Sequence, residues 1–260
     1  MKRLIVTADD VGLDRGMNEG AIRAHREGIV TACSIVANGR AFDDAVARLL
    51  DVPTLEAGVH LALVEEPSLT GIALPRNYVE FIAWYATGSL KLPAVLREMR
   101  AQIERVAATG LRITHLNGHQ HLHVIPSIFA AVRDLAGEFG IGYIRRVDDR
   151  DGHGPLLRRG SMAVLNLLGR RAAGSNDCTI GIMEAGHLTG PRIIELLSEA
   201  GELTELVTHP GVSVAGYAHW CYAWDEETRA LCDPAVAAAL ANNGIELVTP
   251  AGTVRPPTRH

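Results

Sequence analysis

The sequence contains few cysteines and few aromatic residues, and it has no long apolar run. Only 4 of the 260 residues are cysteines and none forms a C-x-x-C pair, which argues against a disulfide framework and a zinc ribbon. No stretch approaches the roughly 18 apolar residues that a membrane-spanning helix needs, so we expect no integral membrane segment. The N-terminal apolar run is too short for a signal peptide and ends at two aspartates, so we expect a cytoplasmic protein.

The charge balance is mildly acidic, and the composition is that of a globular protein. A formal net charge of −5 argues against nucleic acid as a partner, because phosphate backbones attract basic surfaces. Hydrophobic residues make up 47% of the chain, enough for a sizeable core. No repeat, low-complexity tract or linker marks a domain boundary, so we expect residues 1–260 to form a single domain.

Three common catalytic signatures are also missing. The sequence has no G-x-S-x-G elbow, no P-loop and no G-x-G-x-x-G after an expected strand. Serine hydrolase, NTPase and dinucleotide chemistry therefore lack their usual supports.

Short β-rich runs alternate with amphipathic helical stretches along nearly the whole chain. Strands are expected at residues 3–9, 33–38, 57–63, 112–117, 141–147, 179–183, 203–209 and 245–250. Helices are expected at residues 18–28, 41–50, 92–110, 125–140, 154–174, 190–200 and 234–244. This alternation implies crossover units and a mostly parallel sheet. Seven or eight units predict an irregular (β/α) barrel of seven or eight parallel strands, with an open doubly wound sheet as the alternative.

Polar residues stand where several of these strands end, which is where ligands collect in a parallel barrel. The first strand ends in TADDVG, with Asp9 and Asp10 adjacent. Neighbouring strand residues point to opposite faces, so both carboxylates reach one site only if the chain turns, and Gly12 favours a turn. The third strand carries His60 in AGVHLAL, which alone is more typical of a hydrogen-bonded core histidine. The seventh strand ends at His209 in ELVTHPG.

The stretch THLNGHQHLHVIP contains four histidines within nine residues, at positions 115, 119, 121 and 123. These positions and Asn117 would line one face if the strand continued through them. Because the strand is expected to end near Gly118, only some of the imidazoles should reach a shared centre. The alternative is that loop and helix-capping histidines account for the cluster. The spacing alone does not identify which of His119, His121 and His123 reach that centre.

One carboxylate and two imidazoles form a three-ligand set that leaves a divalent cation open positions for water and substrate. Such an ion acidifies water and polarises a carbonyl. A second carboxylate can then accept a proton, and a further histidine can protonate a leaving amine. The strand exits therefore favour metal-assisted hydrolysis.

The four blocks TADDVG, GVHLAL, THLNGHQHLHVIP and ELVTHPG resemble those of the YdjC-like carbohydrate deacetylases, in the same order and over nearly the whole chain. Within that family the sequence is most similar to the hopanoid-biosynthesis-associated branch. The resemblance implies an irregular (β/α) barrel related to the polysaccharide deacetylases. It also implies a divalent metal held by Asp10, His60 and His119, with Asp9 as the base and His209 as the general acid.

The resemblance allows zinc or magnesium, and two imidazoles favour zinc or another transition metal over magnesium. Four further residues are candidates for substrate binding: Asn117, His121, His123 and Arg145. The two histidines could instead orient ligands, and Arg145 and its neighbour Arg146 could instead form a solvated salt bridge with Asp148 or Asp149. Related chito-oligosaccharide deacetylases commonly carry Asp at position 117. Because this chain has an amide there, the resemblance does not imply that it shares their substrate preference.

The implied substrate is an acetylated amino sugar of the N-acetylglucosamine type, either on a hopanoid lipid or in a soluble chito-oligosaccharide. The alternatives are another metal-dependent sugar enzyme, such as a phosphohydrolase or an isomerase, and a non-catalytic metal- or carbohydrate-binding protein. Trp220, Tyr222 and Trp224 suit stacking on sugar rings, but their spacing favours a strand face packed as core. A homodimer is a base-rate expectation.

Overall fold

A computed structural model describes residues 1–149, 163–169 and 174–255. Within them the chain forms one eight-stranded sheet, and all the strand pairs are parallel. The strands are β1 (Lys2–Val11), β2 (Ala32–Ile35), β3 (Glu56–Leu61), β4 (Ile113–Gly118), β5 (Tyr143–Ile144), β6 (Cys178–Ile180), β7 (Leu203–Thr208) and β8 (Ile245–Leu247).

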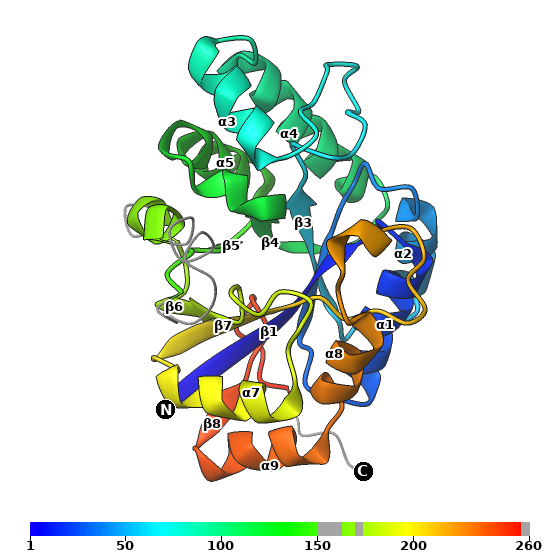
Figure 1. Cartoon of the computed structure of the whole chain (residues 1–260), viewed down its shortest axis with the longest axis vertical. Helices are drawn as coiled ribbons and strands as arrows, with labels where there is room; N and C mark the ends of the chain where they lie inside the picture. The colour runs from blue at the N-terminus through cyan, green and yellow to red at the C-terminus, as the bar shows by residue number, and fades with distance from the viewer. Residues whose placement is uncertain (150–162, 170–173, 256–260) are drawn as a thin grey trace.

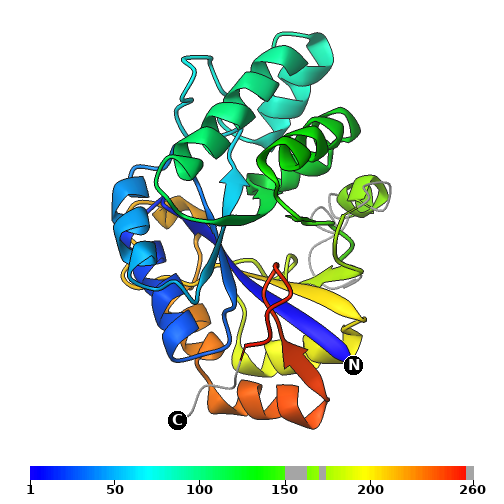
Figure 2. The same ribbon diagram turned by 180° about the vertical axis from the view of Figure 1, so that it is seen from behind.

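The strands pair in the order β5-β4-β3-β2-β1-β7-β6, and β8 joins the start of β1. The sheet curls so that its two ends approach each other (Figures 1 and 2). At this seam, Asp149 forms an isolated parallel bridge with Thr179 of β6. The predicted irregular barrel is confirmed as a curled sheet, whose ends meet through this bridge and not, in the described residues, through continuous strand pairing.

Helices cover the outside of the curled sheet (Figure 1). They are α1 (Arg15–Arg26), α2 (Phe42–Leu50), α3 (Tyr78–Thr87), α4 (Leu92–Ala107), α5 (Pro126–Phe139), α7 (Gly190–Leu196), α8 (Trp224–Leu231) and α9 (Pro234–Asn242), with 3-10 turns η1 (His119–Val124), η2 (Leu197–Glu199) and η3 (Ala218–Trp220). In the described part of the chain, no helix has the length and apolar character needed to cross a bilayer.

Two of these helices were not predicted. Helix α3 begins at an Asn77 cap, whose side chain accepts a hydrogen bond from the Glu80 amide at 2.9 Å. The first turn of helix α8 contains Asp225 and Glu226, whose negative charges complement the helix dipole. The predicted strand 141–147 is shortened to β5. The helix expected at 154–174 lies largely outside the described residues. Within that range the structure describes residues 163–169, which are helical, and Gly174.

Strand β1 shows how the sequence separates the two faces of the sheet. Leu4, Val6 and Ala8 belong to the large apolar cluster between the sheet and its helices. The alternate residues turn inward: Ile5 packs with Tyr143 and Val248 at the bottom of the barrel. The next inward residues of β1, Thr7 and Asp9, are polar and buried.

The middle of the barrel interior is filled by a histidine that a glycine accommodates. His115, on β4, is wholly buried, and its Nε2 lies 3.0 Å from the Ser34 hydroxyl on β2. On the strand between them, a Cβ added to Gly58 would lie 2.4 Å from the His115 ring. Burial lowers the pKa of His115 to about 4, so it is a neutral interior group. His115 therefore has a supporting position in the barrel interior, apart from the other three histidines of the stretch.

Replacing Gly58 by alanine should therefore overpack the barrel. We expect Gly58→Ala to lower the free energy of unfolding by about 1–3 kcal/mol in urea denaturation. Gly137→Ala, in α5 where an added Cβ meets nothing within 4 Å, should instead stabilise the protein by about 0.5–1 kcal/mol. Equal stability of the two variants would contradict this packing.

Candidate active site

The end of β1 departs from strand geometry at Asp10, whose φ is 64°. The register with β2 shifts between Ala8 and Val11, as in a β-bulge. Without this shift, Asp10 would share the outward face of Ala8. The expected turn at Gly12 is present, with φ of 99°, but the left-handed backbone already begins at Asp10. Two adjacent carboxylates, Asp9 and Asp10, thereby face the same cavity.

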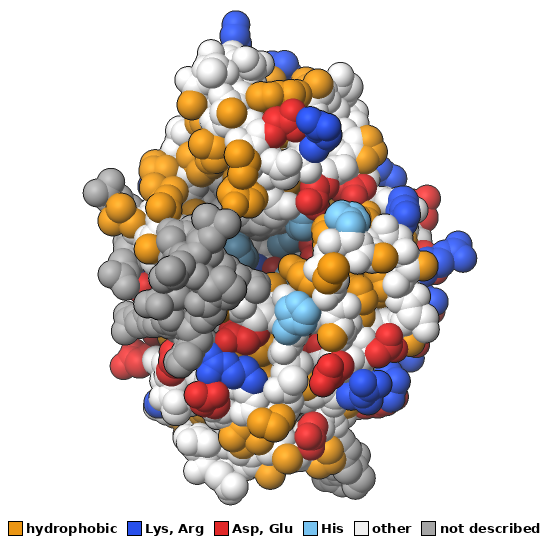
Figure 3. Space-filling model, viewed as in Figure 1, with side chains coloured by type: hydrophobic (Ala, Val, Ile, Leu, Met, Phe, Trp, Pro, Cys, Tyr) orange, Lys and Arg blue, Asp and Glu red, His pale blue; other side chains and the backbone are white. Residues whose placement is uncertain are grey.

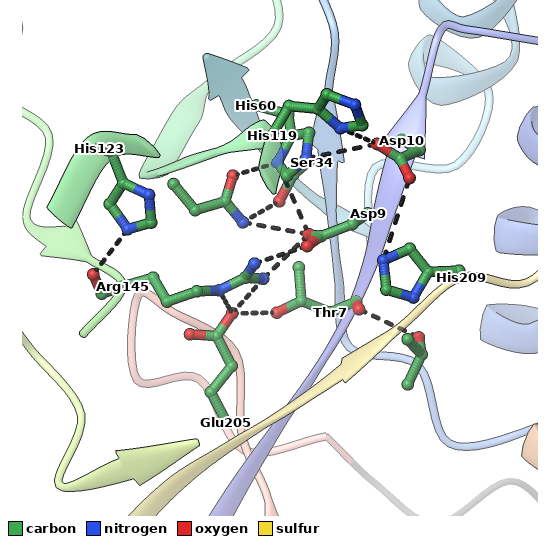
Figure 4. A network of polar contacts seen from close by, with 12 residues as sticks. Thr7, Asp9, Asp10, Ser34, His60, His119, His123, Arg145, Glu205 and His209 are labelled. Atoms are coloured by element: carbon green, nitrogen blue, oxygen red, sulfur yellow. Dashed lines mark hydrogen bonds and ion pairs between the residues drawn. The ribbon is translucent and has the colours of Figure 1, made fainter. Parts of the chain in front are cut away.

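Asp10, His60 and His119 form a buried cluster, the Asp–His–His cluster, at the ends of β1, β3 and β4 (Figure 4). The ligand atoms they offer all lie within 4.8 Å of one another. Asp10 Oδ1 is 3.3 Å from His60 Nε2 and 2.9 Å from His119 Nδ1. The structure thus brings together the three residues predicted as metal ligands.

The electrostatics of the cluster suit a bound cation. Burial alone would raise the pKa of Asp10, but His119 and His60 hold it well below the usual range. Burial would likewise lower the pKa of His119, but Asp10 and Glu65 raise it to about 10. The carboxylates therefore stabilise positive charge at this point, and one oxygen with two nitrogen donors fits a divalent transition metal.

Asp9 has a different set of partners from Asp10. Its carboxylate receives two hydrogen bonds from the Arg145 guanidinium, at 2.5 and 2.9 Å. Burial would raise the pKa of Asp9, but Arg145 and His60 outweigh it and hold the pKa below its ordinary value. Arg145 also donates to Glu205 on β7, at 2.8 and 3.0 Å. Asp9 is thus an ionised, buried carboxylate beside the cluster.

Arg145 and Asn117 do not contact the cavity as predicted for substrate-binding residues. Arg145 is wholly buried and engaged with Asp9 and Glu205, so it has no surface to offer a substrate. The alternative, a salt bridge with Asp148 or Asp149, applies to Arg146, whose Nη2 lies 3.2 Å from Asp148 Oδ2, and not to Arg145.

Asn117 lies beneath the cluster and connects three side chains. Its Oδ1 accepts a hydrogen bond from His60 Nδ1 at 2.7 Å, which leaves His60 Nε2 free to face Asp10. Its Nδ2 donates to Asp9 at 3.1 Å and to the Ser34 hydroxyl at 2.7 Å. An aspartate here could not donate to Asp9, so the amide suits this arrangement.

His209, at the exit of β7, faces the cluster from the other side (Figure 4). Its Nε2 is 3.9 Å from Asp10 Oδ2, and its Nδ1 is buried without a hydrogen-bond partner among the described residues. Burial lowers the pKa of His209. Its ring meets that of Tyr222 edge-on, with the centroids 5.5 Å apart. The predicted general acid therefore lines the same cavity as Asp9 and Asp10.

The cavity over the cluster measures about 370 Å³. It opens as a hollow on the face shown in Figure 3, with histidine side chains inside it. Its apolar wall includes Leu165, Ile182, Ala185, Trp220 and Tyr222. The spacing of Trp220, Tyr222 and Trp224 predicts a strand face packed as core. Trp224 is buried in the core, but it is the first residue of helix α8 and not part of a strand. Trp220 and Tyr222 come from η3 and the loop after it, and they line the cavity.

The last two histidines of the stretch THLNGHQHLHVIP, His121 and His123, have different surroundings. His121 lines the cavity and has a left-handed backbone, with φ of 56°. His123 is buried, and its Nε2 lies 3.1 Å from the Arg145 carbonyl oxygen. Burial, and then Arg145, lower the pKa of His123 to about 3. His121 can therefore reach a ligand in the cavity, whereas His123 supports the chain around Arg145.

Three residues of the site were missed in the sequence. Glu205 shares strand parity with His209, so the alternation of β7 could have revealed it as an inward carboxylate. Glu65 and Gln120 lie in turns, and no spacing in the sequence marks them. Glu65 Oε2 lies 3.0 Å from His119 Nε2, and Gln120 Nε2 donates to Glu65 Oε1 at 2.9 Å.

Known proteins match this chain over most of its length. The family model of YdjC-like proteins matches residues 3–242. A chitooligosaccharide deacetylase of Salmonella paratyphi B is 30% identical over 258 residues, which cover 93% of this chain and 95% of that protein. A carbohydrate deacetylase of Brevibacillus brevis is 37% identical over 147 residues, which cover 54% of this chain and 57% of that protein.

Solved structures show the same fold at lower identity. A protein of Enterococcus faecalis V583 has a TM-score of 0.74 at 21% identity, covering 96% of this chain and 97% of that chain. A peptidoglycan N-acetylglucosamine deacetylase has a TM-score of 0.50 at 11% identity, covering 95% and 85%. The fold and the Asp–His–His cluster define a (β/α)-barrel protein with a candidate metal site. Within that class, the chain belongs to the YdjC-like family.

Behind His209 lies a buried carboxylate whose ionisation should affect stability. Glu227 accepts a hydrogen bond from the His209 backbone amide at 2.5 Å. Burial raises the pKa of Glu227 to about 8, although backbone amides favour the charged form. Because the folded state holds this proton more tightly than the unfolded chain, the stabilisation is complete below about pH 4.5 and is lost as pH rises through about 8.

We therefore expect the free energy of unfolding of the wild-type protein to fall more between about pH 6 and about pH 9 than that of Glu227→Gln, which cannot ionise. Urea denaturation at both pH values, in a buffer with a chelator, measures this difference. Identical pH dependence in the two proteins would refute a raised pKa for Glu227.

Proposed function

We propose that this protein is a metal-dependent carbohydrate deacetylase, which hydrolyses the N-acetyl group of an N-acetylglucosamine-type sugar and releases acetate. One observation carries the proposal: adjacent carboxylates have different partners in one cavity. Asp10 faces two imidazoles, whereas Asp9 faces Arg145. The names of the Salmonella and Brevibacillus relatives, both sugar deacetylases, support the substrate class.

The Asp–His–His cluster would hold the ion. When bound, a divalent metal supplies acidification of water and polarisation of the amide carbonyl. Two imidazole donors and one carboxylate favour zinc, although magnesium remains compatible with the family resemblance. Asn117 Oδ1 accepts the hydrogen bond from His60 Nδ1, so His60 Nε2 points towards Asp10, as metal ligation requires.

The remaining residues would move the protons. Asp9, kept ionised by Arg145, accepts a proton from the water that attacks the carbonyl carbon. His209, on the other side of the cavity, donates a proton to the amine nitrogen as the carbon–nitrogen bond breaks. Acetate and the free amino sugar are the products. Arg145 and Asn117 orient Asp9 in this scheme and do not touch the sugar.

A phosphohydrolase fits the cavity less well. None of the described residues that line the cavity is a lysine or an arginine, whereas phosphate sites are usually built from such cations. A non-catalytic metal-binding protein would have no need of Asp9 and His209 beside a complete ligand set. Variants of Asp9 and His209 that lose acetate release but keep the metal would distinguish a deacetylase from both alternatives.

We expect Asp9→Asn and His209→Ala each to lower the rate of acetate release by about 10²- to 10⁴-fold, with zinc content unchanged. His119→Ala should lose zinc and activity together, and a chelator should have the same effect on the wild type. Metal content is measured by elemental analysis of the same samples. Wild-type turnover in both Asp9→Asn and His209→Ala would show that the roles are wrongly assigned.

We further propose that the acetylated sugar is carried on an apolar group, as in a hopanoid glycoside of the branch that the sequence resembles. Tyr78, at the start of α3, lines the cavity, and it is 46% exposed. On the same helix Val79 is 60% exposed and Ile82 is 48% exposed. Apolar side chains also gather beside the hollow in Figure 3. Such a rim suits a lipid-like aglycone better than a second sugar.

The double variant Val79→Ser/Ile82→Ser should therefore lose turnover on an N-acetylglucosaminyl hopanoid and keep turnover on N-acetylated chitobiose. Acetate release from each substrate, by wild type and variant in parallel, measures this. A wild-type preference for chitobiose, or an equal loss on both substrates, would contradict an apolar aglycone.

A further inference from the structure

Glu65 occupies a turn between β3 and α3 from which its carboxylate reaches the Asp–His–His cluster. Its backbone is left-handed, with φ of 67°, although glutamate rarely adopts that conformation. One carboxylate oxygen lies 3.0 Å from His119 Nε2, and the other accepts a hydrogen bond from Gln120 at 2.9 Å. Gln120 in turn accepts from the Tyr78 amide of α3. The carboxylate is thus held in place from both sides.

The two nitrogens of His119 face different groups. Nδ1 lies 2.9 Å from Asp10 Oδ1, and Nε2 faces Glu65. A neutral imidazole that binds a metal through Nδ1 must carry its proton on Nε2, and that proton needs an acceptor in a buried site. His60 has the mirror arrangement, because its Nδ1 faces Asn117 and its Nε2 faces Asp10. Each imidazole of the cluster therefore has its own acceptor on the nitrogen away from Asp10.

Other contacts of His119 do not supply this acceptor. The Trp220 ring stacks on the imidazole, with the centroids 5.5 Å apart, and so restricts the ring plane. An indole ring cannot choose which nitrogen carries the proton. The neighbouring Glu66 is turned away and accepts a hydrogen bond from the Tyr217 hydroxyl at 2.6 Å. Among the described residues, Glu65 is the one whose carboxylate is within hydrogen-bond distance of His119 Nε2.

We propose that Glu65 is a positioning residue for the metal site: it accepts the His119 Nε2 proton and thereby presents His119 Nδ1 to the ion. The inference rests on the proposed function, since it assumes that the Asp–His–His cluster binds a metal. Glu65 itself need not touch the ion. Through Gln120 and Tyr78, the same carboxylate connects the metal site to the start of α3 at the rim of the cavity.

The test is zinc affinity, measured on the full-length protein by competition with a chromophoric chelator. Glu65→Ala should bind zinc about 10- to 100-fold more weakly than the wild type. Glu65→Gln should recover part of this loss, because its amide oxygen can still accept the Nε2 proton. Glu66→Gln, a matched change one residue away that can still accept from Tyr217, should bind zinc as the wild type does.

A second readout separates positioning from a general loss of structure. In zinc-loaded protein labelled with ¹⁵N-histidine, long-range ¹H–¹⁵N spectra should show His119 with its proton on Nε2 in the wild type and a mixed or shifted pattern in Glu65→Ala. Unchanged zinc affinity in Glu65→Ala and Glu65→Gln, with a wild-type His119 pattern, would overturn the inference and leave the proposed function standing. Absence of zinc binding in the wild type would overturn both.

Discussion

In a β-strand only every second side chain points towards a cavity on one face, but this site needs the side chains of two consecutive residues. The left-handed backbone at Asp10 removes that restriction, because it turns into the barrel a carboxylate that would otherwise pack against the outer helices. Asp9 and Asp10 then share one cavity but not one environment. The separation of an imidazole-facing carboxylate from an arginine-bound one, on which the proposed chemistry depends, follows from this single change of φ.

The second requirement is that buried charges be compensated. Arg145 lies between Asp9 and Glu205 with no exposed surface, and Glu205 also accepts hydrogen bonds from the Tyr143 and Thr7 hydroxyls. Removing one partner of such a group would leave an uncompensated charge in the barrel. The polar interior is therefore a connected network beneath the cavity (Figure 4). It fixes Asp9, while Asn117 and Glu65 orient the two imidazoles of the Asp–His–His cluster.

Much of this arrangement could be predicted from the sequence, because strand alternation and strand exits are local signals. The parallel barrel and the convergence of Asp9, His60 and His209 follow from that pattern. The choice of His119 came only from family resemblance, since its turn breaks the alternation. The partner of Arg145 could not be predicted, because the contact joins residues 136 positions apart. Glu65 also escaped notice, since it reaches the site through a turn of irregular backbone.

The most direct test of this account is anomalous diffraction at the zinc edge from crystals grown with zinc. The account expects one strong peak bounded by Asp10, His60 and His119, with Asp9 still hydrogen-bonded to Arg145 and not among the ligands. A peak coordinated by Asp9, or no peak at this cluster despite zinc bound in solution, would contradict the division of roles between the two adjacent carboxylates.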